Sequence, residues 1–349
     1  MQTIQDTLET LKNKAYKTYK QTEKPLKKDS LLYFSNCITQ SYKLIIKEKE
    51  IITFAILQFV FIALGYYLWV QILDWIPEEV WEKAKKSDDI SLADIILLVW
   101  TFICVGLTTY PLGILTACMG AAHFLHENNE ESSIAKCLRI VLPNAWTIWI
   151  FSWIDGWWTV ERILERLPKK RNRVPLAQKL INEAIYQSWK IASLAFLPAL
   201  IIGRGINNSY QDSLKMLKTN FKTIGQLRLA YSIICWIFGI ASYIGAFFMV
   251  SYIFSQMSNH NDMHTFYTFI GIPIFVSLFF IQVIFRPIYI LSACRIYSNY
   301  IRQNNIPINL PTVSKFTSTI IAFIVLAIIV CTIFLYKDTL IIAPLTSIQ

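Results

Sequence analysis

The sequence is poor in charged residues. Asp, Glu, Lys and Arg make up only 16% of its 349 residues, and 54% are hydrophobic. Soluble domains average about 25% charged residues. Several uncharged apolar runs also exceed the roughly 18 residues that cross a bilayer as a helix. These features exclude an ordinary soluble domain and predict an all-α, polytopic transmembrane helical bundle.

Familiar catalytic and metal-binding motifs are missing as well. The seven cysteines form no CxxC pair and lie mostly in apolar runs, so neither a disulfide framework nor a zinc site is predicted. No serine elbow, phosphate-binding glycine loop or HExxH occurs. Paired carboxylates on facing spans, which a di-metal site or a proton relay would need, are not apparent either. We therefore expect no enzymatic activity and no cofactor.

The basic excess, a net charge of +10, is best explained by membrane topology. Lys and Arg flank the apolar runs and form no soluble basic domain, which argues against nucleic-acid binding. The first 50 residues are polar, so we expect insertion to start from an internal segment. The positive-inside rule then places the N-terminus in the cytoplasm and the C-terminus outside. The clearest predicted spans are residues 51–73, 93–122, 229–254, 265–285 and 316–336.

The stretch PNAWTIWIFSWIDGWW at 143–158 is harder to place. Residues 140–158 could cross, but basic residues follow them, and the next apolar run, 191–202, is short. One arrangement makes both runs re-entrant or interfacial, and the other makes them a transmembrane hairpin. A tryptophan stripe along a helix favours the interfacial arrangement. We therefore predict a membrane-interface role for Trp146, Trp149, Trp153, Trp157 and Trp158.

Two charged features adjoin this stretch. Asp155 lies within an apolar run, and an acid in the membrane is a candidate functional site. Alternatively, it is a helix-end acid that reaches water or pairs with Arg162. PKKRNR at 168–173 could attract anionic lipid or act only as a topology determinant. The predicted lipid-binding patch consists of Lys169, Lys170, Arg171 and Arg173.

Two histidine pairs are weak candidates for metal ligands. His123 and His126 can share a helix face, with Glu127 completing a site. His260 and His264 flank an acid in a loop predicted to lie outside. The predicted topology puts the pairs on opposite sides of the membrane, so they cannot form one site. The plain alternative for the first pair is an interfacial helix end.

Three regions follow from these observations. Residues 1–30 form a lysine-rich amphipathic segment, residues 31–312 a multi-pass membrane domain, and residues 313–349 an extra span with a short tail. Within the domain, NCITQSYK at 36–43 and NSYQDSLK at 208–215 share Asn, Ser and Lys at equal spacing. Each segment precedes a span. Either a duplicated helix–span unit or chance in a biased composition would explain this similarity.

The order of motifs resembles an uncharacterised family of prokaryotic multi-pass membrane proteins, a domain of unknown function. The similarity covers residues 31–312, without the lysine-rich start and the last span. A similar segment order occurs in the membrane region of some glycerophosphodiester phosphodiesterases. The resemblance implies a bacterial inner-membrane location and no particular activity. The matching segments are FSNCITQSYKLIIKEKEII, ILTACMGAAHFL, SWKIASLAFLPALIIGRGINNSYQDSLKML and RIYSNYIRQNNIP.

Taken together, the sequence predicts an integral membrane protein that organises or binds lipid or partner proteins. Membrane lipids are the expected partners. Protein partners or further copies of the chain are alternative or additional partners. A transporter of a small solute or lipid is an alternative, because proline-broken short segments resemble discontinuous transporter helices. A lipid-headgroup enzyme is the other alternative, with His123, His126 and Glu127 as its only candidate residues.

Overall fold

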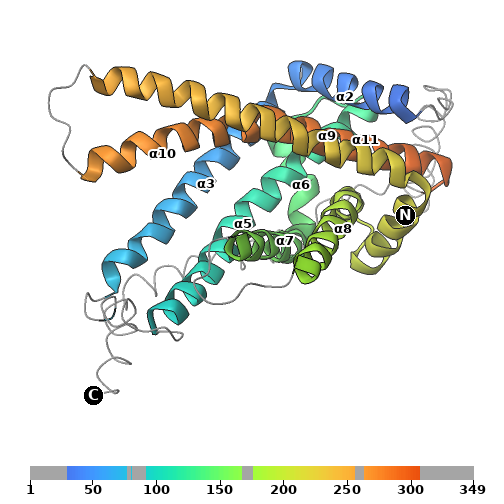
Figure 1. Ribbon diagram of the computed structural model, residues 1–349. Coiled ribbons are helices and arrows are strands. Elements are labelled where there is room, and N and C mark those ends of the chain that lie inside the picture. Colours follow the sequence, from blue (N-terminus) through green and yellow to red (C-terminus); the bar gives the residue numbers. More distant parts are fainter. Residues whose placement is uncertain (1–29, 77–79, 81–91, 167–175, 256–262, 307–349) are drawn as a thin grey trace. The chain divides into compact units, whose positions relative to one another are not determined.

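A computed structural model describes residues 30–76, 80, 92–166, 176–255 and 263–306 (Figure 1). The described residues form helices and contain no strand, which confirms the predicted all-α fold. The predicted segment before α2 and the predicted last span and tail lie outside the described residues. The helices are α2 (Ser30–Lys47), α3 (Lys49–Trp75), α5 (Leu92–Glu127), α6 (Ile134–Val141), η1 (Leu142–Asn144), α7 (Ala145–Arg166), α8 (Leu176–Ile201), α9 (Ile206–Ser255), α10 (Met263–Phe280), the π-helical turn η2 (Ile281–Phe285) and α11 (Arg286–Gln303).

Five helical stretches among the described residues are long and apolar enough to cross a membrane, which makes the chain a multi-pass membrane protein. One of them contains the predicted span 93–122, and three overlap the predicted spans 51–73, 229–254 and 265–285. The tryptophan-rich run falls in the remaining one, so its length and composition permit crossing. The choice between crossing and re-entry stays a prediction. The stretches are Lys49–Ile72, Ala93–Glu127, Ile134–Arg162, Ile206–Ile253 and Gly271–Gln303.

The chain divides into two compact units. Unit 1 comprises residues 1–56, 116–138 and 188–310, and unit 2 comprises residues 57–115, 139–187 and 311–349. The long helices α3, α5 and α8 each contribute to both units. Unit 1 therefore receives the start of α3 and the end of α5, while unit 2 receives the apolar remainder of both helices.

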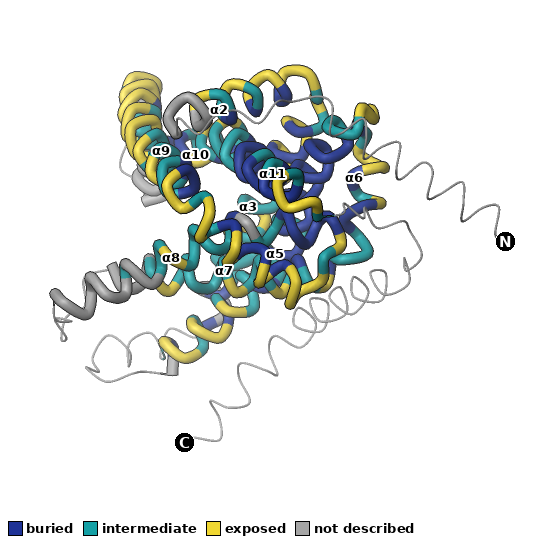
Figure 2. Tube along the Cα trace, turned by 90° about the vertical axis from the view of Figure 1, so that its right-hand side faces the viewer, coloured by how far each residue is buried: buried dark blue, intermediate teal, exposed yellow. Residues whose placement is uncertain are grey.

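Helix α11 forms the core of unit 1. Eleven of its residues, among them Tyr297 and Ile301, are buried although the helix carries three arginines. It packs against α2 and α9, and Figure 2 shows it largely in the colour of buried residues. The Ser41 and Ser292 hydroxyls are 3.0 Å apart and hydrogen-bond α2 to α11. Because α11 is buried by protein, its polar side chains face other helices of the unit.

Small residues hold α5 and α7 together in unit 2. A Cβ atom added to Gly106 would lie 2.7 Å from the Trp153 ring, and one added to Gly113 would lie 2.3 Å from Ser152 Oγ. The Trp149 indole N–H donates to the Gly106 carbonyl at 2.7 Å. Small residues let helices approach closely, which is the main source of helix association in lipid. Glycine is therefore required at these positions by close packing.

The sequence similarity between residues 36–43 and 208–215 has a counterpart in the structure. The first segment lies in α2 and the second at the start of α9, and in each the central serine, Ser41 or Ser213, is buried. Each helix is then interrupted at the matching distance. Glu48 lies outside regular helix before α3, and Asn220 has non-helical φ and ψ of −124° and 22° within α9. Each interruption precedes an apolar stretch that can cross a membrane.

The end of α5 and the whole of α11 extend this match. PLGILTAC at 111–118 corresponds to PIYILSAC at 287–294, and HENN at 126–129 to RQNN at 302–305. Both helices end on an asparagine in the left-handed region, with φ of 59° at Asn129 and 52° at Asn305. The next residue in each case donates its N–H to a carbonyl five residues back, at 3.0 and 3.1 Å. We call residues 36–129 the first repeat and residues 208–305 the second repeat.

Candidate functional site

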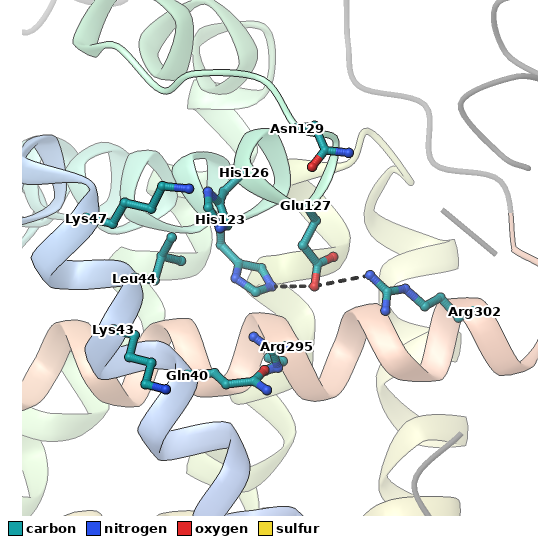
Figure 3. A pocket seen from close by; sticks show the side chains of 10 residues that line it. All are labelled: Gln40, Lys43, Leu44, Lys47, His123, His126, Glu127, Asn129, Arg295 and Arg302. Carbon is teal, nitrogen blue, oxygen red and sulfur yellow. Dashed lines mark ion pairs between the residues drawn. The ribbon is translucent and has the colours of Figure 1, made fainter. Parts of the chain in front are cut away.

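A pocket of about 370 Å³ lies in unit 1 (Figure 3). This volume falls within the range typical of small-ligand sites, roughly 300–1,000 Å³. Three elements line the pocket: α2, the last turns of α5 with its cap, and α11. The first two belong to the first repeat and α11 to the second repeat. The lining residues are Gln40, Lys43, Leu44, Lys47, His123, His126, Glu127, Asn129, Arg295 and Arg302.

The amphipathic pattern of α2 explains why its lysines line the pocket. Cys37, Ser41 and Leu44 recur at spacings of four and three and are buried, so they mark the packed face. Lys43 and Lys47 are four residues apart and share an exposed face. Neither lysine forms an ion pair with another described residue. Their charges are therefore available to a ligand in the pocket.

Among the described residues that line the pocket, the one carboxylate comes from the end of α5. His123 is 2% exposed, and its Nε2 atom lies 3.3 Å from Glu127 Oε1, one helical turn later. The Arg302 guanidinium of α11 lies 3.5 Å from the same oxygen. Figure 3 shows this carboxylate between the imidazole and the guanidinium. A buried charge needs such partners, so Glu127 is compensated within the protein.

His126 has a different partner from His123. Its Nδ1 atom lies 3.3 Å from Glu48 Oε1, in the break between α2 and α3. The Ser132 hydroxyl donates to the other oxygen of Glu48 at 2.5 Å. The structure thus brings His123 and Glu127 together, as their spacing predicts, but pairs His126 elsewhere. Within the described ranges, no group of three or more His, Cys, Asp or Glu side chains could hold a metal ion.

The pocket carries an excess of positive charge. Lys43, Lys47, Arg295 and Arg302 are cationic, and Glu127 is the one acid among the described residues that line the pocket. Because Arg302 already faces this carboxylate, the charges of the two lysines are not offset by it. Several cations around one concave space attract an anion and strengthen one another's effect. The arrangement is therefore suited to binding an anionic group.

A second ion pair joins Arg204, just before the second repeat, to the buried Asp212 within it. Arg204 Nε donates to Asp212 Oδ2 at 2.9 Å, and the Tyr297 hydroxyl donates to the same oxygen at 3.4 Å. Asp212 is only 4% exposed. The pair joins the glycine-flanked turn before α9 to the first turns of α9 and to α11. Its groups satisfy one another, so this cluster holds the fold and leaves no open charge.

The tryptophan stripe packs partly against α5. Trp153 and Trp157 contact Phe102 with ring centroids 4.9 and 5.0 Å apart, and Trp149 contacts Tyr110 edge-on at 5.5 Å. Trp146 is 58% exposed. The stripe is thus also a seam between helices of unit 2, which its spacing alone did not indicate. The membrane-interface role of these residues, Trp158 included, stays a prediction.

Asp155 lies on α7 and is partly exposed. Arg162, the partner that the sequence suggested, forms an ion pair with Glu183 of α8 at 3.2 Å and lies over the Tyr186 ring. The other candidates cannot be compared with the structure. Lys169, Lys170, Arg171, Arg173 and His260 lie outside the described residues, and of His264 only the backbone position in α10 is described.

Sequence reasoning missed most of the pocket. Lys43 and Lys47 are some 250 residues before Arg295 and Arg302 in the chain. No local motif links these residues, because the folding of α11 against α2 brings them together. Comparisons with protein-family models, with curated proteins and with solved structures found no match. Function must therefore be argued from the pocket itself.

Proposed function

We propose that this integral membrane protein binds the anionic headgroup of a membrane lipid in the pocket of unit 1, without catalysis. The observation that carries the proposal is the excess of cationic side chains over a single, already compensated carboxylate. Each basic residue near a membrane surface adds on the order of 1 kcal/mol of attraction to anionic lipid. Lys43 and Lys47, in a concave site that two arginines also line, would retain such a headgroup.

The position of the pocket along the chain supports a lipid ligand. His123, His126 and Glu127 lie at the very end of one candidate span, and Lys47 lies just before the start of another. Headgroups occupy the zone where transmembrane helices end. A pocket built from span ends therefore meets headgroups before it meets soluble molecules.

The outer face of α2 gives further support. Tyr42 and Ile46 are 53% and 61% exposed, one turn apart, and each adjoins a pocket lysine. Aromatic and aliphatic side chains beside lysines are typical of helices that lie in the membrane interface. On this view α2 contacts lipid through Tyr42 and Ile46 and offers the headgroup Lys43 and Lys47.

We also propose a bacterial inner-membrane location with a cytoplasmic N-terminus and an outside C-terminus, as charge placement and the family resemblance suggest. The pocket would then face the cytoplasmic leaflet. In the variant Lys47→Cys, the cysteine should not react with an impermeant thiol reagent in intact cells. It should react once the membranes are opened. Labelling in intact cells would contradict this orientation.

The binding proposal is tested with the full chain in detergent or nanodiscs. Phosphatidylglycerol binding is measured by native mass spectrometry for the wild type and for Lys43→Ala/Lys47→Ala. The double variant should bind about 30-fold more weakly, since two lysines contribute roughly 2 kcal/mol. Lys215→Ala/Lys218→Ala removes the same charge from exposed positions on α9 and should bind like the wild type. Equal losses in both variants would show nonspecific attraction and refute the pocket.

Transport of a lipid or small solute is a second candidate. The supporting observation is that the pocket lies between two repeats whose helices are interrupted at Glu48 and Asn220, a plan found in many transporters. Vesicles that contain fluorescent lipid and the reconstituted protein would test it. If the protein moves lipid between leaflets, an impermeant quencher should remove nearly all the fluorescence instead of about half. Half quenching would reject lipid transport.

A further inference from the structure

We infer that His126 is a further ligand of the headgroup in this pocket, and that it binds the lipid phosphate through Nε2 when its ring is protonated. Glu48 acts as the positioning residue for this ring. The inference rests on the proposed function and adds a binding residue whose charge depends on pH. The chemical class bound is an anionic phosphodiester lipid, and its binding should strengthen as the pH falls.

The contacts of His126 leave one ring nitrogen for a ligand. Nδ1 lies 3.3 Å from Glu48 Oε1, and the Ser132 hydroxyl donates to the other oxygen of that carboxylate. Within the described part of the chain, no hydrogen bond or ion pair involves Nε2 of this ring. The His126 side chain is 35% exposed and lines the pocket together with Lys43 and Lys47. The pocket therefore gives a phosphate oxygen access to the ring.

His123, one turn earlier on α5, is in a different situation. It is 2% exposed, and its Nε2 atom lies 3.3 Å from Glu127 Oε1 and 3.5 Å from Ser298 Oγ. The nitrogen that could meet a ligand is thus already engaged within the protein. Of the two histidines that line the pocket, His126 is the one that can bind a headgroup.

The Glu48 carboxylate determines what the second nitrogen of His126 can do. A carboxylate opposite Nδ1 favours a proton on that nitrogen, so Nε2 of the neutral ring carries a lone pair, which repels a phosphate oxygen. When the ring takes up a second proton, Nε2 becomes an N–H donor. The pair of His126 and Glu48 then changes from one negative charge to none. Protonation therefore adds a charged donor and removes a net negative charge, and both changes favour an anion.

Histidine is the only side chain that ordinarily changes its charge between pH 5 and 8. A phosphodiester also keeps one negative charge over this range, because it has no second proton to lose. A change of affinity with pH would therefore report on the histidines. The charged or titratable residues that line the pocket beside His126 are Lys43, Lys47, His123, Glu127, Arg295 and Arg302. Those in the adjoining segments are Glu48, Lys49, Glu50, Glu130, Glu131 and Cys137.

The second repeat provides matched substitutions for both histidines. His126 corresponds to Arg302, and His123 corresponds to Asn299. His126→Arg therefore places a permanent cation at a helix position that holds arginine in the second repeat. His123→Asn removes the other histidine by the same logic, so the two variants separate the contributions of the two rings.

The test measures equilibrium binding of labelled short-chain phosphatidylglycerol to the full chain in a non-ionic detergent at pH 5.5 and pH 8. The wild type should bind about fivefold more tightly at pH 5.5, which is the effect of one basic residue near a membrane surface. His126→Arg should bind tightly and His126→Gln weakly at both pH values. His123→Asn should keep the fivefold ratio of affinities. Thermal unfolding at both pH values checks that each variant is folded.

The positioning role of Glu48 has its own measurement. An opposite charge within about 4–6 Å favours the charged form of a titratable group. In Glu48→Gln, the loss of binding with rising pH should therefore occur at a lower pH than in the wild type. Glu50→Gln is the control, because Glu50 shares the Ser132 hydroxyl at 3.4 Å, and it should shift the pH profile less. Equal shifts in the two variants would overturn the role of Glu48.

The remaining outcomes separate this inference from the proposed function. A fivefold ratio that persists in His126→Arg, or that disappears in His123→Asn, would overturn the assignment of His126. Binding that Lys43→Ala/Lys47→Ala weakens, that Lys215→Ala/Lys218→Ala preserves and that pH does not alter would overturn the inference and leave the lipid-binding proposal standing. Binding that no pocket variant alters would overturn both.

Discussion

The two repeats share a backbone plan and differ where the pocket lies. Both contain an amphipathic helix, an interruption, an apolar stretch, a proline and a helix that ends on a left-handed asparagine. At the pocket, however, His126 and Glu127 of the first repeat correspond in sequence to Arg302 and Gln303 of the second. The residues that shape the backbone are thus alike, whereas most of those that line the pocket differ. A duplicated scaffold that later diverged at the pocket would account for this difference.

The largest expected effect comes from breaking the ion pair between Asp212 of the second repeat and Arg204, which lies just before that repeat. Arg204→Ala leaves the Asp212 carboxylate buried with only the Tyr297 hydroxyl, which should lower the free energy of unfolding by about 3 kcal/mol. In the first repeat, Gln40 occupies the position of Asp212, and Gln40→Ala should cost less than about 1 kcal/mol. Chemical denaturation in micelles compares the two variants. Equal losses in the free energy of unfolding would show that the Arg204–Asp212 ion pair gives the second repeat no stabilisation that the first repeat lacks.

A second comparison uses one helix position in two environments. Gly113 of α5 faces Ser152, but Tyr289 at the corresponding position of α11 stacks on Tyr231 with ring centroids 4.3 Å apart. Gly113→Ala should push α7 away from α5 and destabilise the protein by roughly 1–3 kcal/mol.

Tyr289→Phe, which keeps the ring, serves as the control for this comparison and should stay within about 0.5 kcal/mol of the wild type. The measurement is thermal unfolding followed by tryptophan fluorescence, since unit 2 contains the tryptophan seam. A stable Gly113→Ala variant would show that the two helices separate without cost.

The smallest expected effect tests whether the two repeats are equivalent. Asn129→Gly and Asn305→Gly both place glycine where φ is positive, so each should stabilise the protein slightly, by up to about 1 kcal/mol. Asn129→Ala and Asn305→Ala should destabilise by a similar amount. Paired measurements of the melting temperature would show whether the caps respond alike. Opposite signs at the two sites would argue against a shared capping motif.

Most of the fold could be predicted from composition. An apolar run of about 20 residues in lipid has little alternative to forming a helix, because its backbone polar groups must bond to one another. The short sequence similarity between residues 36–43 and 208–215 also indicated that the chain contains two repeats. The match between the end of α5 and α11 was harder to see, since both segments looked like ordinary span ends. The structure adds that both helices end on an asparagine in the left-handed region, at Asn129 and Asn305.

The site was much less predictable. His123 and Glu127 pair because they are one turn apart, which spacing alone predicts. Arg302 joins them from a distant helix, and that contact depends on how α11 packs in unit 1. Buried charge seemed nearly absent from the apolar runs, yet Asp212 and Glu127 are both buried ionic groups. The sequence conceals them because each lies at a helix end next to polar residues.

The distribution of the pocket over the chain also sets the order of its assembly during synthesis. Lys43, Lys47, His123 and Glu127 emerge from the ribosome early, while Arg295 and Arg302 emerge only after some 170 further residues. Until α11 arrives, the Glu127 carboxylate lacks its guanidinium partner and the pocket lacks one wall. If the pocket binds a headgroup as proposed, a chain released too soon would be unable to hold it, and headgroup retention would then report completed biogenesis.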